Sequence, residues 1–142
     1  NYRLSNVCAG IGRGQMLSLP SFLEKRRGIH EEYRRRLSGV PGLSLLENPD
    51  SRYHSNHWLT CVQVNPEEAR FDRETLRLAL QKAGVESRPL WKPMHLQPVF
   101  RSCPFYGSGV SDRLFEEGLC LPSGASLAGE DMDRIIDVLL NL

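Results

Sequence analysis

The chain has 142 residues, of which 40% are hydrophobic, and 18 Lys and Arg against 17 Asp and Glu leave a formal charge of +1. This length suits one globular domain that buries roughly two-thirds of the surface exposed by its unfolded chain. A charge near zero gives no reason to expect nucleic acid or an anionic membrane as a partner. No apolar run approaches the roughly 18 residues of a spanning helix and no export signal is visible, so we expect a cytoplasmic protein without a membrane partner.

The first element predicted is a long helix from an N-cap at Ser5 to about Ser38, bent near Pro20. Its first half contains three glycines, Gly10, Gly12 and Gly14, each of which costs ~1 kcal/mol of helix stability relative to Ala. We interpret them as sites of close packing against another element, which lies outside this chain if not within it. The alternative interpretation is a glycine loop that binds phosphate. Apolar residues follow at helical spacing: Phe22, Ile29, Tyr33 and Leu37. The basic triplets Lys25 to Arg27 and Arg34 to Arg36 are predicted to be a solvated face rather than a nucleic-acid site.

Strands are predicted over residues 43 to 46 and 58 to 64. A second helix is capped by Asp72, with a hydrophobic staple of Phe71 and Leu76, and ends at Gly84. Residues 85 to 88 are predicted to be extended, and four prolines and two glycines make residues 89 to 109 a long loop with at most a turn or two of helix.

A short helix at 112 to 117, a strand at 119 to 121 and a final helix complete the chain. The final helix has an apolar stripe formed by Met132, Ile135, Ile136, Leu139 and Leu140. The expected fold class is α+β, in which two or three antiparallel strands are packed with helices, preceded by the long bent helix. We expect a single domain over 1–142, with 1–38 as the long helix and 39–142 as an α/β sandwich.

Several candidate sites have weak support. The residues His54, His57 and Cys61 do not have the spacing of a known zinc site, so no metal is expected. The segments around Ser108 and Ser123 lack the pattern of a nucleophile elbow and are interpreted as turns. The four cysteines form no CxxC pair and are expected to be reduced thiols.

The segment SRPLWKPMH (87 to 95) concentrates Arg88, Trp91, Lys92 and His95 in a proline-stiffened loop. A Trp face, two cations and an imidazole suit a sugar that carries a phosphorylated nucleotide, through stacking and charge-assisted hydrogen bonds. An ordered surface loop with a buried Trp is the alternative.

Three segments in order, NYRLSN (1 to 6), SRPLWKPMHLQPVF (87 to 100) and LCLPSG (119 to 124), resemble the DegT/StrS-type nucleotide-sugar aminotransferases. The resemblance implies the C-terminal small domain of a fold-type I enzyme that uses pyridoxal 5′-phosphate (PLP). It also implies an N-terminal large domain missing from this chain, a homodimer that shares its active sites, and amino transfer from glutamate to a 4-keto-6-deoxy nucleotide sugar for surface glycans.

The resemblance also implies roles for single residues. Asn1 and Arg3 would bind the cofactor, with Asn1 reaching the PLP phosphate of the neighbouring subunit, and Arg88, Trp91, Lys92 and His95 would bind substrate. The Schiff-base lysine of the family lies upstream of this segment, so no catalytic residue is assigned and the chain alone is expected to be inactive. The chain opens at Asn1 and enters a helical pattern almost at once, so we expect a piece of a longer protein. The alternative is an autonomous module that keeps this fold and binds a nucleotide or a protein.

Overall fold

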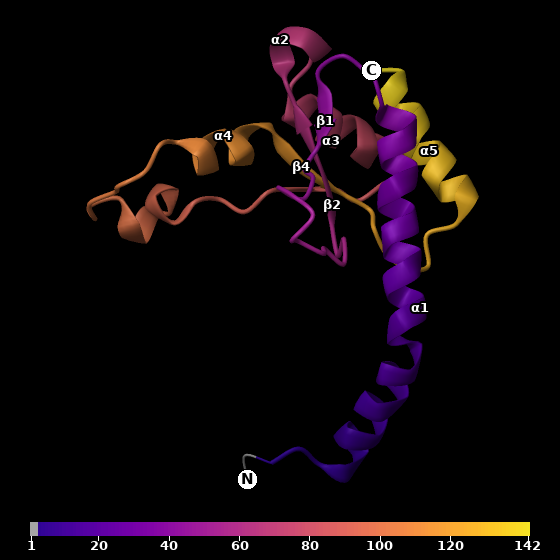
Figure 1. Cartoon of the computed structure of the whole chain (residues 1–142). Coiled ribbons are helices and arrows are strands. Elements are labelled where there is room, and N and C mark those ends of the chain that lie inside the picture. Colours follow the sequence, from indigo (N-terminus) through magenta and orange to yellow (C-terminus); the bar gives the residue numbers. More distant parts are fainter. Residues whose placement is uncertain (1–2) are drawn as a thin grey trace.

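The computed structural model describes residues 3–142, in which helices pack on a small sheet (Figure 1). In chain order its elements are α1 (Asn6–Leu37), β1 (Leu43–Leu45), β2 (Thr60–Val64), α2 (Pro66–Ala69), α3 (Arg73–Lys82), β3 (Arg88–Pro89), η1 (Met94–Leu96), η2 (Pro98–Phe100), α4 (Val110–Glu117), β4 (Gly118–Leu121) and α5 (Gly129–Leu140). This arrangement confirms the α+β class expected from the sequence.

Helix α1 is 32 residues long and begins where the sequence predicts. The Ser5 hydroxyl accepts a hydrogen bond from the Cys8 amide at 3.2 Å, which satisfies one of the free donors of the first turn. Pro20 lies inside the helix and removes one of its hydrogen bonds, which favours a bend. Figure 1 shows the N-terminal half of α1 curving away from the rest of the molecule.

The sheet has four antiparallel strands in the order β1-β2-β4-β3. The expectation of two or three strands was too low by one. The fourth is the two-residue edge strand of Arg88 and Pro89, which overlaps the segment 85 to 88 predicted to be extended but lies at its end. Pro89 is tolerated there since the outer side of an edge strand needs no N–H donor. The second strand begins at Thr60 rather than at Trp58, so Trp58 precedes the sheet.

The hydrophobic core lies between one face of the sheet and helices α1, α3 and α5. Alternate residues of β2 point into it, and Thr60, Val62 and Val64 are fully buried. The other main contributors, each at most 4% exposed, are Tyr33, Leu76, Leu80, Leu119, Leu121, Met132, Ile135, Ile136 and Leu139. Two apolar positions predicted on helix stripes are not buried, because Phe22 lies in the projecting half of α1 and Leu140 at the end of α5.

Local signals fix the remaining helices. The Asp72 carboxylate accepts from the Thr75 amide at 2.7 Å at the start of α3, and Gly84 follows the helix with a φ of +73°. The single turn α2 was missed; the Asn65 side chain caps it by accepting from the Glu67 amide at 3.1 Å. The loop from 89 to 109 contains two single turns, η1 and η2, and Figure 1 shows it extending away from the sheet beside α4. Within residues 3–142, no helix has the length and apolar character needed to cross a membrane.

The start of α5 lacks a side-chain cap, since Ala128 occupies the N-cap position with extended backbone. Replacing Ala128 by Thr should supply a hydroxyl acceptor for a first-turn amide and raise the free energy of unfolding by about 1 kcal/mol. Urea denaturation followed by circular dichroism measures this change. Ala128→Val has the same shape without the hydroxyl, so equal stability of the Thr and Val variants would show that no cap forms.

Candidate functional site

Two arginines of α1 fix the segment that leads into β2. Arg26 donates to the backbone carbonyl of Trp58 at 2.7 Å and to that of Ser123 at 3.3 Å, while Arg27 donates to the carbonyl of Ser55 at 3.2 Å. Charge-assisted hydrogen bonds of this kind are stronger than neutral ones. This basic triplet is therefore not simply a solvated face: it holds Trp58 beside the end of β4.

A pair of stacked histidines also contacts the segment that leads into β2. His30, 4% exposed, stacks on His57 with ring centroids 3.7 Å apart and an angle of 20°. The His30 Nε2 atom lies 3.3 Å from both carboxylate oxygens of Glu47, and Nδ1 lies 3.5 Å from the Thr60 hydroxyl. A carboxylate can only accept, so Nε2 is the donating nitrogen, and in the neutral ring Nδ1 accepts from Thr60.

A hollow with a volume of about 720 Å³ opens between the end of the sheet, β3 and α5. Trp58 and Trp91 both line it, with ring centroids 6.3 Å apart and an angle of 43° between the planes. The two side chains are 58% and 67% exposed, although an aromatic pair at this distance is normally buried in a core or an interface. The rings therefore offer open faces on which a flat or weakly polar ligand could pack.

Arg88 supplies a cation to the wall of this hollow. Its guanidinium group donates to one Glu86 oxygen at 2.9 and 2.6 Å, and the two side chains are 79% and 74% exposed. Exposed ion pairs contribute about 0–1 kcal/mol, so a bound phosphate could replace Glu86 at little cost. The predicted residues Arg88 and Trp91 are thus brought together.

Lys92 and His95 are placed differently, since neither is among the residues that line this hollow. Lys92 is exposed, and its carbonyl accepts from the Gln97 side chain at 3.2 Å. The His95 ring stacks on Phe105 at 3.6 Å, and its Nε2 lies 2.6 Å from an Asp112 oxygen, although these two atoms do not have hydrogen-bond geometry. In this structure His95 therefore links the loop to α4.

The cofactor residues expected from the resemblance lie at the start of the chain. Arg3 is exposed just before α1, and Asn1 lies outside the described residues. The helix glycines Gly10, Gly12 and Gly14 are also exposed, and a Cβ atom added to any of them would meet nothing within 4 Å. The close packing predicted for these glycines is not made within residues 3–142.

The serine and histidine candidates that had weak support in the sequence make structural contacts. The Ser123 hydroxyl accepts from the Thr60 amide at 2.8 Å and donates to the Leu121 carbonyl at 3.0 Å, so it ties β4 to β2 as part of a turn. His57 is stacked on His30, and across residues 3–142 no group of three or more His, Cys, Asp or Glu side chains is arranged to hold a metal ion.

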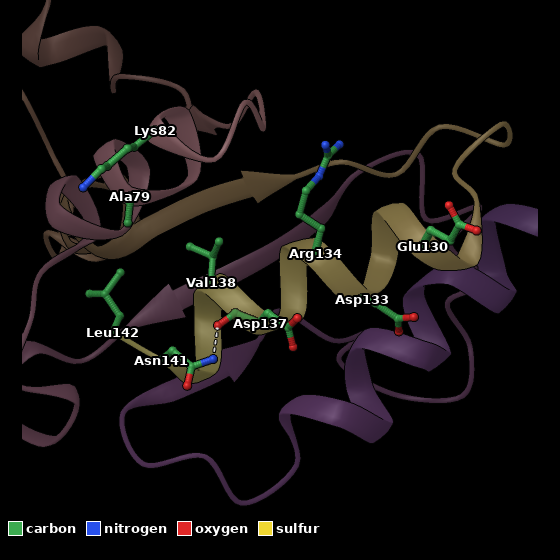
Figure 2. Close-up of a pocket in the computed structure, with 9 residues that line it drawn as sticks. All are labelled: Ala79, Lys82, Glu130, Asp133, Arg134, Asp137, Val138, Asn141 and Leu142. Carbon is green, nitrogen blue, oxygen red and sulfur yellow. Dashed lines mark hydrogen bonds between the residues drawn. The ribbon is translucent and has the colours of Figure 1, made fainter.

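A second hollow, of about 640 Å³, lies between α3 and α5. Figure 2 shows Lys82 on one side of this hollow and the charged residues of α5 on the other. The side-chain amide of Asn141 donates to the backbone carbonyl of Asp137 at 2.7 Å. This last contact closes the end of α5, and the hollow contains none of the predicted site residues. It is a groove between two helices rather than a candidate site.

Two residues of the site were missed in the sequence. Trp58 was assigned to a strand, and its place at the hollow depends on contacts with α1 that are 32 residues away in sequence. His30 was not among the residues singled out in the sequence. A His on the same helix face as Tyr33 and Leu37 was the one signal available for its burial.

Comparison with known proteins identifies the class. The crystal structure of the aminotransferase TlmJ from Streptoalloteichus hindustanus superposes with a TM-score of 0.82 and 29% identity, over 95% of this chain and 35% of that chain. The fold is thus that of a segment of a fold-type I aminotransferase. A model of the DegT/DnrJ/EryC1/StrS aminotransferase family matches residues 1–140, and the chain belongs to this family of sugar aminotransferases.

Two curated relatives show how much of such a protein the chain represents. The chain is 37% identical over 146 residues to EpsN of Bacillus subtilis, which is named as a pyridoxal phosphate-dependent aminotransferase; the match covers 100% of this chain and 37% of EpsN. It is 29% identical to the GDP-perosamine synthase of Vibrio cholerae, over 99% of this chain and 38% of that protein. The chain spans little more than a third of the length of these relatives.

The described residues do not fit pyridoxal phosphate on their own. Such enzymes hold the cofactor through a lysine amine, together with donors around its phosphate. Of the three lysines of this chain, none lines the hollow beside Trp58 and Trp91. No catalytic step through the cofactor can be assigned to residues 3–142.

The histidine stack predicts a dependence of stability on pH. Partial burial, followed by the charge of His30, lowers the pKa of His57 below its ordinary value of 6.5. The unfolded chain therefore takes up this proton at a higher pH than the folded chain, and the stability present above pH 6.5 is lost as the pH falls through the lower folded value. His57→Asn, which tolerates the positive φ at this position, should flatten this part of the pH profile measured by urea denaturation.

His54→Asn is the matched control, because it makes the same change on an exposed side chain three residues away. It should leave the profile unchanged. If the His57 and His54 variants lose stability in acid as steeply as the original chain, His57 does not carry this dependence.

Proposed function

We propose that the chain is the C-terminal small domain of a PLP-dependent aminotransferase that transfers an amino group from glutamate to a 4-keto-6-deoxy sugar linked to a nucleoside diphosphate. The family match over residues 1–140 is the observation that carries this proposal. The share of the relatives that the chain covers, 37% and 38%, supports the assignment to one part of a larger enzyme. Surface glycan synthesis is the process proposed for the product.

In this proposal, residues 1–38 link the sandwich at 39–142 to a large domain. The first half of α1 supports it, because apolar side chains there are exposed to an extent that an isolated domain rarely shows. The exposed fractions are 73% for Val7, 61% for Ile11, 64% for Met16 and 81% for Leu17, and Leu4, just before the helix, is 74% exposed. The large domain and the second subunit of a homodimer are the partners proposed for this surface, and Asn1 and Arg3 are proposed to reach the cofactor phosphate.

The role proposed for this chain is to bind the nucleotide end of the substrate. The open faces of Trp58 and Trp91 suit a nucleobase, and Arg88 lies on the same wall to meet the diphosphate. Lys92, exposed next to Trp91, is a second cation for the phosphates. His95 is proposed to contact the sugar, which requires it to leave Asp112.

The proposed chemistry is divided between this chain and the rest of the enzyme. Residues that the longer relatives contain upstream are proposed to supply the Schiff-base lysine, so the 142-residue chain alone is expected to be inactive. The hollow contains cations and aromatic rings but no lysine, which agrees with a binding role rather than a catalytic one.

An autonomous binding module is the second candidate. The assembled hollow favours it, because Trp58, Trp91 and Arg88 are already positioned in this chain by itself. Calorimetric titration with UDP-, GDP- and dTDP-sugars separates the two candidates. Tight binding to a monomer that does not self-associate would favour the module.

A chimera tests the main proposal. The C-terminal part of EpsN that matches this chain is replaced by the chain itself, and amino transfer from glutamate to nucleotide sugars is measured with PLP present. The chimera should be active and the isolated chain inactive. Activity of the isolated chain, or a folded chimera that binds PLP but transfers no amino group, would contradict the proposal.

Trp91→Ala in this chimera should raise the KM for the nucleotide sugar roughly tenfold, because stacking of a base on an aromatic ring contributes about 1–3 kcal/mol. The kcat should change much less, since Trp91 is proposed to bind the nucleotide and not the reacting carbon. Trp91→Phe, which keeps an aromatic face, is the matched control. A KM that Trp91→Ala leaves unchanged would place the nucleotide elsewhere.

The apolar surface of α1 predicts self-association of the isolated chain. Val7 and Ile11 lie four residues apart on one face of the helix, and replacing both by Lys should shift the chain toward monomer in sedimentation velocity. The control adds the same two charges on the exposed side chains of Ser102 and Ser111, away from α1. If the original chain is already a monomer, this surface does not drive association.

A further inference from the structure

Cys61 and Cys120 face each other across the two central strands. They are direct partners in the register of β2 with β4, and their Sγ atoms are 3.8 Å apart. The two residues are 59 positions apart in sequence, so the sheet alone brings them together. Their contact does not depend on the proposed aminotransferase activity.

The hydrogen bonds of neighbouring strands define the geometry of this pair. The Cys61 carbonyl accepts from the Leu46 amide, so the backbone groups of Cys61 point toward the β1 side. The Gly118 carbonyl accepts from the Leu90 amide, so the backbone N–H and C=O groups of Gly118 point toward β3. Because this direction repeats every second residue of a strand, the backbone groups of Cys120 also point toward β3. Cys61 and Cys120 are therefore a non-hydrogen-bonded pair, in which side chains approach most closely.

Such a pair has the spacing that a disulfide requires. The Cα atoms of non-hydrogen-bonded partners are about 4.5 Å apart, and disulfides span Cα distances of about 4.4–6.8 Å. The Sγ atoms need to approach one another by a side-chain rotation, without a change in strand register. We propose that Cys61 and Cys120 are a redox modification site, at which a low-molecular-weight disulfide oxidises the two thiols to a reversible cross-strand disulfide.

The surroundings of the pair leave it within reach of such a reagent. Both cysteines lie on the sheet face opposite the main core. On that face α4 is attached near the C-terminal end of β2, where the side-chain amide of Gln63 donates a hydrogen bond to the Glu117 carboxylate. Cys61 is partly exposed, and Cys120, although 7% exposed, lines the hollow of about 720 Å³. Oxidation would thus change the wall of the hollow that also contains Arg88.

The reaction proceeds in two exchange steps with glutathione disulfide as the oxidant. The hydrogen bond from the Cys61 thiol lowers the pKa of Cys120, which makes Cys120 the attacking thiolate. It displaces one glutathione and forms a mixed disulfide; Cys61 then loses its proton to solvent, attacks the Cys120 sulfur and releases the second glutathione. Two cysteine thiols are oxidised and one glutathione disulfide is reduced to two glutathione molecules.

The test uses the chain with Cys8→Ser and Cys103→Ser, which removes the two exposed thiols and leaves the pair. After incubation with glutathione disulfide, intact mass should show the loss of two hydrogen atoms, and both thiols should be unreactive after denaturation until dithiothreitol is added. A product that carries stable glutathione, or two thiols still free under conditions that oxidise Cys8 in the original chain, would overturn the proposal.

Two controls separate this site from general thiol reactivity. Adding Cys61→Ser to the same background should abolish the loss of two hydrogens and leave at most one glutathione adduct, while circular dichroism verifies the fold. Guanidinium should slow disulfide formation in the two-cysteine chain by separating β2 from β4. Equal rates in the folded and unfolded chain would show that the strand register does not position the pair.

Discussion

The pairing of β2 with β4 is the constraint on which the rest of this structure depends. The two strands are almost sixty residues apart in sequence, and their register fixes both faces of the sheet at once. Val62 and Leu119 point into the core on one face, while Cys61 and Cys120 meet on the other. A shift of one residue would exchange these faces and place thiols in the core, so burial of the apolar set specifies the register strongly.

The same pairing positions the candidate site. Trp58 precedes β2 and Ser123 follows β4, so the two ends meet, and one arginine of α1 bonds to the carbonyls of both. Tyr33, about two turns further along α1 than this arginine, donates to the Pro122 carbonyl at 3.0 Å, and its burial raises its pKa. Helix α1 therefore holds the start of β2 and the end of β4 together through these hydrogen bonds. The two tryptophan rings remain at the wall of the hollow.

Local signals in the sequence predicted much of this fold. The caps at Ser5 and Asp72 and the left-handed Gly84 mark helix ends by contacts between neighbouring residues, which a sequence reveals directly. The loop residues Arg88 and Trp91 were also predicted together, because they are close in the chain. Trp58 and His30 were not, since their positions arise from contacts between distant segments. For β3 the sequence predicted extended chain over 85 to 88 but not the bounds of the strand, because two residues are too few to show a period.

The edges of the sheet limit how this domain can associate. One edge is the two-residue strand β3, which ends in a proline without an N–H donor, and the other is the three-residue strand β1. Short strands and edge prolines prevent a foreign strand from extending a sheet. Contacts with other proteins must therefore be made by side chains on helices and loops, so surface substitutions can change them without disturbing the backbone pairing of the sheet.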